Sequence, residues 1–241
     1  MATRFSLANR VIVLILSGVF GCGTDLLLPD PPGGGENVEL SKLDGDKQVG
    51  VVGEQLQQPL VVQVMTDRGL GANGREVEFV FTDAAGVVTP SQTITNTEGK
   101  AYANWVLGTQ PGPQSVAARL VVSEDAEPQD EEFTAEARPA APDTVSAKSP
   151  TSQPGRRGQA VGTQPVVQVV DRFGNPVPGV PVAWQVTIGG GSVSEAIALT
   201  DEAGTSTVDW TLGSRRGVQR LTATVGPITG SPVSFTATVL F

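Results

Sequence analysis

Hydrophobic and polar residues alternate along several short segments of the chain. The period of two runs through residues 76–81 and 101–107, and it returns in residues 207–212 and 233–239. One face of each segment is apolar and the other is largely polar, which is typical of strands that lie between a core and water. About seven such strands per hundred residues, separated by turn residues, predict an all-β protein built from antiparallel β-sandwiches.

The pattern also repeats itself at a shift of 105 residues. Residues 61–119 align with residues 166–224 without a gap, and Trp105 and Trp210 are among the shared landmarks. Pro and Ala interrupt the alternation between the two copies. We therefore predict two tandem β-sandwiches, with the first over residues 38–138, a linker over residues 139–143 and the second over residues 144–241.

The first residues are typical of a secretory signal. Arg4 and Arg10 precede an uncharged apolar run over residues 11–20, which is too short to span a membrane. An ordinary signal peptide with an incidental cysteine is one interpretation. Residues 19–22, Val-Phe-Gly-Cys, resemble instead the lipobox of bacterial lipoproteins, although Phe20 stands where a small residue is usual.

The lipobox resemblance implies a signal peptide over residues 1–21 and an acylated Cys22 as the first residue of the mature chain. The lipid would then attach the protein to a membrane. Gly23 follows Cys22 where an Asp would favour inner-membrane retention, so the resemblance implies the outer membrane, facing the surface or the periplasm. Residues 22–37 are rich in Pro and Gly and predict a flexible tether.

Composition narrows the possible chemistry. The chain has no His and one Cys, which excludes Ser-His-Asp and Cys-His catalysis, His-ligated zinc and an internal disulfide. The formal net charge of −9 argues against a nucleic-acid partner. A hydrolase that uses paired carboxylates stays possible, but no pair of acids recurs at strand ends. We expect no catalytic residue, no metal site and no cofactor.

Several segments of the second copy resemble a known family. Those segments are residues 174–186, 189–194, 201–213 and 229–239, and they are similar to the bacterial immunoglobulin-like domain of the first group, the repeat of invasin- and intimin-type surface proteins. The first copy is more divergent. The resemblance implies a non-enzymatic cell-surface lipoprotein that acts as an adhesion or binding stalk, with a surface glycan or protein as ligand. The alternative is a structural spacer, or an accessory subunit of an envelope complex without a ligand of its own.

Four sets of residues are candidates for chemistry beyond the fold. The tryptophans could stack on sugars, but they share the apolar faces of their strands, which favours core packing. The acidic run could bind calcium, but its spacing favours a solvated hairpin connection. Asp171 and Asp201 are expected to cap turns. The arginine doublets could dock an anionic glycan or lipid headgroup if they met at one end of the sandwich, whereas scattered loop charges are the simpler interpretation. The sets are Trp105, Trp184 and Trp210; Glu124, Asp125, Glu127, Asp130, Glu131 and Glu132; Asp171 and Asp201; and Arg156, Arg157, Arg215 and Arg216.

Overall fold

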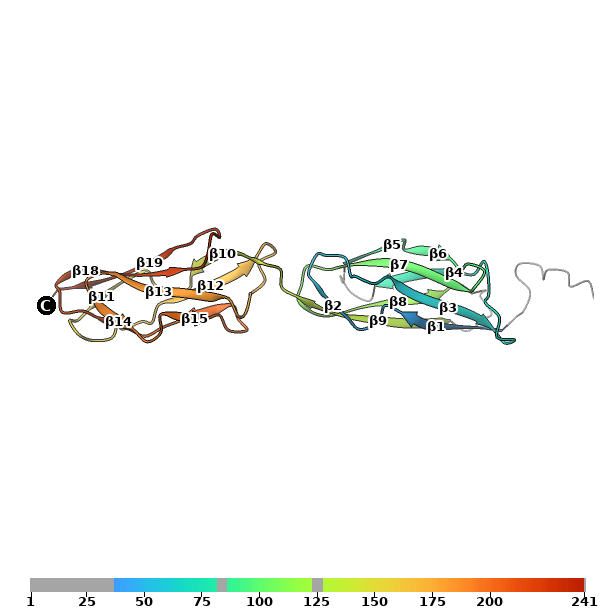
Figure 1. Cartoon of the computed structure of the whole chain (residues 1–241), viewed down its shortest axis with the longest axis horizontal. Helices are drawn as coiled ribbons and strands as arrows, with labels where there is room; N and C mark the ends of the chain where they lie inside the picture. Colours follow the sequence, from blue (N-terminus) through green and yellow to red (C-terminus); the bar gives the residue numbers. More distant parts are fainter. Residues whose placement is uncertain (1–36, 82–85, 123–127, 241) are drawn as a thin grey trace, which may run out of the picture. The chain divides into compact units, whose positions relative to one another are not determined.

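The computed structural model describes residues 37–81, 86–122 and 128–240. Its first sandwich consists of two sheets that enclose one core (Figure 1). One sheet has the order β1 (Val38–Asp44), β3 (Leu60–Thr66), β7 (Lys100–Leu107) and β5 (Gly86–Thr89). The other has the order β2 (Gln48–Val51), β9 (Gln129–Arg138), β8 (Gly112–Leu120), β4 (Glu76–Phe81) and β6 (Gln92–Ile94).

The second sandwich repeats this plan. Its larger sheet has the order β11 (Ser152–Gly155), β19 (Val233–Val239), β18 (Gly217–Thr224), β13 (Pro181–Ile188) and β15 (Ile197–Leu199). Across the core lie β10 (Pro142–Ala147), β12 (Val166–Asp171) and β16 (Thr205–Thr207), with β14 (Gly191–Val193) paired to β17 (Trp210–Leu212). The tandem sandwich fold expected from the sequence is confirmed.

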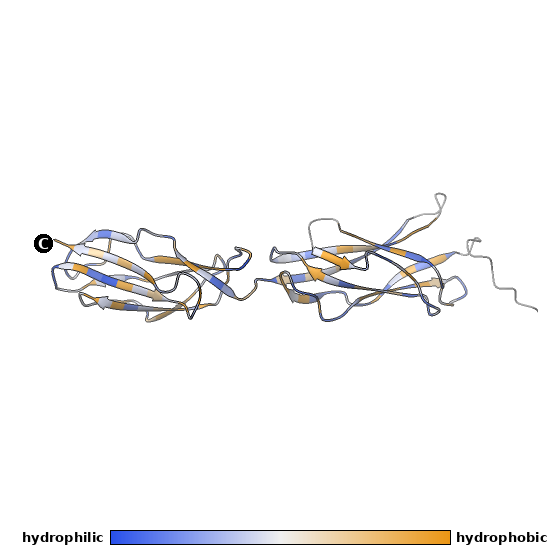
Figure 2. Ribbon diagram, turned by 90° about the horizontal axis from the view of Figure 1, so that it is seen from above, coloured by the Kyte–Doolittle hydropathy of each residue, from blue (hydrophilic) through white to orange (hydrophobic). Residues whose placement is uncertain are grey.

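Each sandwich has its own core, and the period-two residues fill it. Figure 2 shows hydrophobic and hydrophilic residues alternating along the strands. Trp105 and Phe133 are fully buried in the first core, and Trp210 and Phe235 are fully buried in the second. Each such side chain removes enough apolar surface from water to contribute about 3 kcal/mol. Because the described cores contain no cysteine, this burial is the main source of stability.

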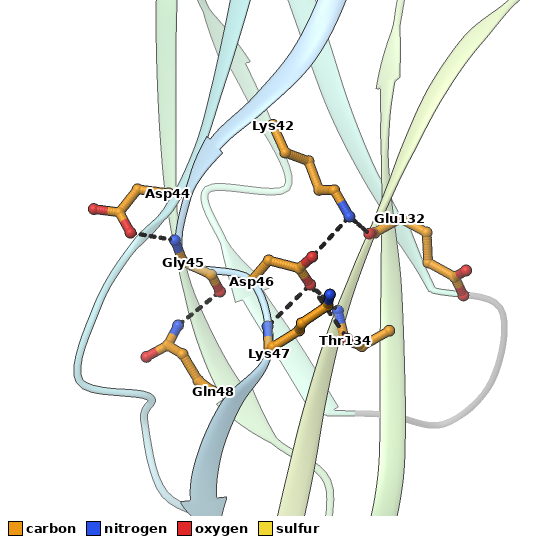
Figure 3. A network of polar contacts seen from close by, with 8 residues as sticks. All are labelled: Lys42, Asp44, Gly45, Asp46, Lys47, Gln48, Glu132 and Thr134. Carbon is orange, nitrogen blue, oxygen red and sulfur yellow. Dashed lines mark hydrogen bonds and ion pairs between the residues drawn. The ribbon is translucent and has the colours of Figure 1, made fainter.

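The chain crosses between the two sheets of the first sandwich just after β1, and a polar network holds the crossing (Figure 3). Asp46 accepts hydrogen bonds from the Lys42 ammonium at 2.8 Å and from the backbone N–H groups of Lys47 and Thr134 at 3.0 and 2.9 Å. Burial would raise the pKa of Asp46, but the hydrogen bonds from Lys42 and Thr134 outweigh it, so the pKa lies below its ordinary value. The network fixes where β2 begins.

This crossing introduces a parallel strand pair into a sandwich whose other described strand pairs are antiparallel. After the crossing, β2 pairs with the last strand of its sandwich, β9, in parallel, and β11 pairs with β19 in the same way. The two sandwiches also differ in one strand, the one that pairs with β5 in the first sandwich. The long β7 of the first sandwich corresponds to two shorter strands, β16 and β17, in the second. The chain therefore leaves the regular ladder at Val208 and Asp209.

The predicted signal peptide, the acylated Cys22 and nearly all of the tether fall on residues 1–36, outside the described residues. Their assignment stays a prediction. Within the part of the chain that is described, no helix has the length and apolar character needed to cross a membrane.

The three consecutive glycines 189–191, the last of which begins β14, provide a sharp test of the backbone. Gly191 has a φ of +102°, and a Cβ there would collide with the carbonyl oxygen of Thr211 across the β14–β17 ladder. Gly190 also has a positive φ, of +75°, but open space surrounds its Cα. We expect Gly191→Ala to reduce the free energy of unfolding by about 3 kcal/mol and Gly190→Ala by about 1 kcal/mol, measured by urea unfolding. Equal losses would contradict this close approach.

Candidate functional site

The three tryptophans are core residues. Trp105 and Trp210 are completely buried and Trp184 is 2% exposed. The Trp184 Nε1–H donates a hydrogen bond to the Ser206 hydroxyl at 3.2 Å, and its ring lies 5.9 Å from that of Phe235. The prediction of core packing is confirmed, and the sugar-stacking alternative is wrong because no face of these rings reaches solvent.

The acidic run divides between a strand and a connection. Asp130, Glu131 and Glu132 belong to β9, so their placement in a hairpin connection is corrected. The β8–β9 ladder continues to Gln129, and within it Arg119 pairs with Asp130 through two hydrogen bonds of 2.9 Å. This bond from Arg119 lowers the pKa of Asp130. Glu124, Asp125 and Glu127 lie outside the described residues, and no described group of acids is arranged to hold a metal ion.

Asp171 caps the connection between β12 and β13, as predicted. Its carboxylate accepts hydrogen bonds from the N–H groups of Phe173 and Asn175 at 2.9 Å, from the Asn175 amide at 3.0 Å and from the Ala140 N–H at 3.0 Å. Burial would raise the pKa of Asp171, but these hydrogen bonds, led by Asn175, hold it below the ordinary value. Asp171 therefore fixes a loop and the residue that precedes β10.

Asp201 performs the same task in the turn between β15 and β16. It accepts hydrogen bonds from the N–H groups of Thr205 and Ala203 at 2.8 and 3.0 Å, and the bond from Thr205 is the main reason why its pKa is lowered. Asn96 occupies the corresponding position of the first sandwich and accepts the same two kinds of bond, from Glu98 and Lys100. The prediction that Asp201 caps a turn is confirmed, and the first sandwich has an equivalent cap at Asn96.

A buried glutamine closes the end of each sandwich. The side-chain oxygen of Gln219 accepts a hydrogen bond from the Gly213 N–H at 2.8 Å, and its amide donates to the carbonyl groups of Arg215 at 2.9 Å and Gly213 at 3.2 Å. Gln219 is completely buried. Gln114 closes the equivalent loop of the first sandwich through Gly108 and Gln110. Neither glutamine is predicted from the sequence, although the two lie at equivalent positions of the 105-residue repeat, which could have identified them.

The structure brings the two arginine doublets to the same end of the second sandwich. Arg156 and Arg157 follow β11, whereas Arg215 and Arg216 lie between β17 and β18. The Gly158 N–H donates to the Gly213 carbonyl at 3.4 Å, which joins the two loops. All four arginines are exposed. The condition under which the doublets could dock an anion, that they meet at one end of the sandwich, is fulfilled for their loops. We call these four residues the arginine end.

The chemistry available at this end is recognition of negative charge. Guanidinium groups present a planar fork of donors that fits carboxylate, sulfate and phosphate groups, and they stay protonated at all physiological pH values. Asp171, Asp201 and Gln219 are engaged in hydrogen bonds that close loops of the fold.

Lowering the pH should weaken the Asp171 cap. A carboxylate with a lowered pKa in the folded state stabilises the fold above the ordinary value of 3.8, and this contribution is lost as the pH falls through the lowered value. At pH 6 we expect Asp171→Asn to unfold with about 2 kcal/mol less free energy than the wild type, and we expect the gap to narrow as the pH falls below 3.8 and through the lowered pKa of Asp171. Urea unfolding across this range measures it, with Glu195→Gln as the exposed control. A gap independent of pH would refute the cap.

Removing the buried glutamine should open the arginine loop. We expect Gln219→Ala to reduce the free energy of unfolding by about 3 kcal/mol, because it leaves the half-buried Gly213 N–H without its side-chain partner and creates a cavity where the buried Gln219 side chain was. The exposed Gln159, which contributes backbone groups to the same end, serves as the control. Gln159→Ala should change the free energy of unfolding by less than about 0.5 kcal/mol in the same chemical denaturation experiment. A similar, small effect for both variants would mean that Gln219 does not hold the loop.

Comparison with known proteins identifies a family for most of the second sandwich. Residues 162–238 match the model of the bacterial Ig-like domain of group 1. Three solved structures are similar: the Escherichia coli adhesin FdeC, with 17% identity over 86% of this chain and 65% of that chain and a TM-score of 0.53; Yersinia pseudotuberculosis InvD, with 15% over 84% and 57% and a TM-score of 0.49; and the D0–D1 domains of intimin, with 20% over 83% and 94% and a TM-score of 0.31.

No curated protein sequence matches the chain. Identities this low show the fold alone, and the chain spans about two thirds of the FdeC structure. The family match covers β12 to β19 almost completely, together with the Asp171 and Asp201 caps and the Gln219 closure. Residues 162–238 of the second sandwich are therefore a bacterial immunoglobulin-like domain of group 1.

Proposed function

We propose that the protein is a lipid-anchored component of the bacterial cell envelope whose two sandwiches form a non-enzymatic adhesion or binding stalk. The observation that carries this proposal is the group 1 Ig-like domain at residues 162–238, with loops that buried side chains fix in place. Rigid sandwiches with exposed loops are a common scaffold for recognition. FdeC, whose fold is similar, is an adhesin.

Cys22 would be the point of attachment. It follows a charged and then apolar segment that is typical of an export signal, and it is the single cysteine of the chain. Lipid at this residue would hold the chain on a membrane while residues 23–37, which are rich in Pro and Gly, act as a tether for the sandwiches.

The anchor is tested by metabolic labelling. Cells that express the wild-type chain and the Cys22→Ser variant are grown with radiolabelled palmitate. We expect label on the wild type and none on the variant, which should leave the membrane fraction. Equal labelling of both chains, or of neither, would remove the anchor from the proposal.

Binding is tested on whole cells that display the protein. We expect these cells to adhere to an array of glycans and extracellular-matrix proteins more strongly than cells without it, and we expect Cys22→Ser to abolish the difference because the chain is no longer held on the cell. Binding at background level across the array would favour the spacer, a module that positions other proteins and has no ligand of its own.

A further inference from the structure

We propose that the arginine end of the second sandwich binds an anionic polysaccharide, with sulfate or carboxylate groups of the glycan held in the forks of Arg156, Arg157, Arg215 and Arg216. This inference rests on the proposed function, because it names the site and the ligand class of the binding module.

The two doublets form one surface because their loops are joined. The Gly158 N–H donates to the Gly213 carbonyl, and the Leu212 N–H donates to the Gln159 carbonyl at 3.0 Å. Chain geometry then places the Cα atoms of Arg157 and Arg215 at most about 20 Å apart. Strands β11, β14 and β18 meet at this end, beside the C-terminal residues (Figure 1). The chain enters the sandwich at the opposite end, where Pro142 pairs with Asp171.

The surface is fixed before any ligand arrives. Gln219 bonds to the backbone of the Arg215 loop at both Gly213 and Arg215. Gly189 packs so closely on the Gln219 side chain that a Cβ at Gly189 would collide with it. A loop held in this way loses little conformational entropy on binding, which leaves more of the interaction energy as affinity.

The charges of the arginine end are not neutralised within the described chain. The described ion pairs are Lys42–Asp46, Lys100–Glu98 and Arg119–Asp130, all in the first sandwich. Asp171, Asp201 and Glu202 belong to connections at the opposite end of the second sandwich, because β13 begins there and Pro181 pairs with Leu199. None of the described ion pairs involves these four arginines, which therefore place positive charge at one end of the sandwich.

The first sandwich shows that the fold does not need these arginines. At the shift of 105, Val51 and Val52 stand where the second sandwich has Arg156 and Arg157, and Gln110 and Pro111 stand in place of Arg215 and Arg216. Val52 is fully buried in its core, whereas its counterpart Arg157 is exposed. The buried glutamine is kept in both copies, but the charge belongs to the second copy alone.

A flexible polyanion fits this layout better than the other anions do. Two doublets on adjoining loops can hold successive charged groups of one chain, whereas a single lipid headgroup offers one such group at a time. A nucleic-acid duplex carries charge along its whole length, and the first sandwich, with its many carboxylates, would repel it. Arginine pairs bidentately with sulfate and carboxylate alike, so the glycan class is defined by its charge.

A comparison of binding to dextran sulfate and to uncharged dextran separates the contribution of the negative charge from that of the sugar. The full chain in neutral detergent should bind dextran sulfate, with an affinity that falls as salt rises, and should not bind dextran. We expect Arg156→Gln with Arg157→Gln, and separately Arg215→Gln with Arg216→Gln, to weaken binding about tenfold each, and the quadruple variant to weaken it at least about a hundredfold. The control, Arg68→Gln with Arg75→Gln, removes the same charge from the first sandwich and should stay within about twofold.

Thermal melting of every variant shows that folding is intact. Wild-type affinity in the quadruple variant would overturn the proposal, and so would binding to phosphatidylglycerol vesicles without binding to dextran sulfate, which would indicate a lipid surface. Cell adhesion that survives in the quadruple variant would leave the proposed function standing and remove this site from it. Arginine-dependent binding of dextran sulfate without any cell adhesion would support this site and contradict the proposed adhesion function.

Discussion

Strands of a sandwich end where backbone groups still need hydrogen-bond partners, and in this protein polar side chains, several of them buried, supply them. Gln114 and Gln219 close one end of each sandwich, and Asp171, Asp201 and Asn96 close turns at the other. Thr95 and Thr200 tie a third pair of loops, each bonding to a carbonyl and an N–H group across the connection. An unpaired buried polar group is costly, so these side chains leave each loop one conformation.

The same set of polar closures lets the exposed residues differ between the two copies. Gln48 and Gln153 each bridge to a loop ten residues later through two bonds, so the strand-crossing region is also fixed in the same way. With these loops closed in the same way, the two copies can carry different residues at equivalent positions: Val51 and the buried Val52 in one sandwich, and the exposed Arg156 and Arg157 in the other. The residues on these loops can thus differ between the copies without a change of fold.

The sequence predicts the faces of the strands well, because a period of two directly states which side chains meet the core. Trp105 and Trp210 lie where that pattern places them. Pairing across the fold is harder to predict: the parallel β2–β9 contact and the meeting of Gly158 with Gly213 join segments far apart in the chain. Alternation alone also does not reveal that β9 extends into the acidic run, where Arg119 pairs with Asp130 across the β8–β9 ladder. The burial of Gln114 and Gln219 is not predicted, because a polar residue within an alternating strand pattern indicates an exposed position.

Amide hydrogen exchange at Gly213 tests most directly whether a buried glutamine holds the arginine end in place. The account predicts that the Gly213 N–H exchanges slowly, near the rate set by global unfolding, and that the Gly108 N–H, held by Gln114, behaves in the same way. In Gln219→Ala the Gly213 amide should exchange much faster, while Gly108 keeps its protection. Rapid exchange of Gly213 in the wild-type chain, at the rate of an exposed loop amide, would contradict the account.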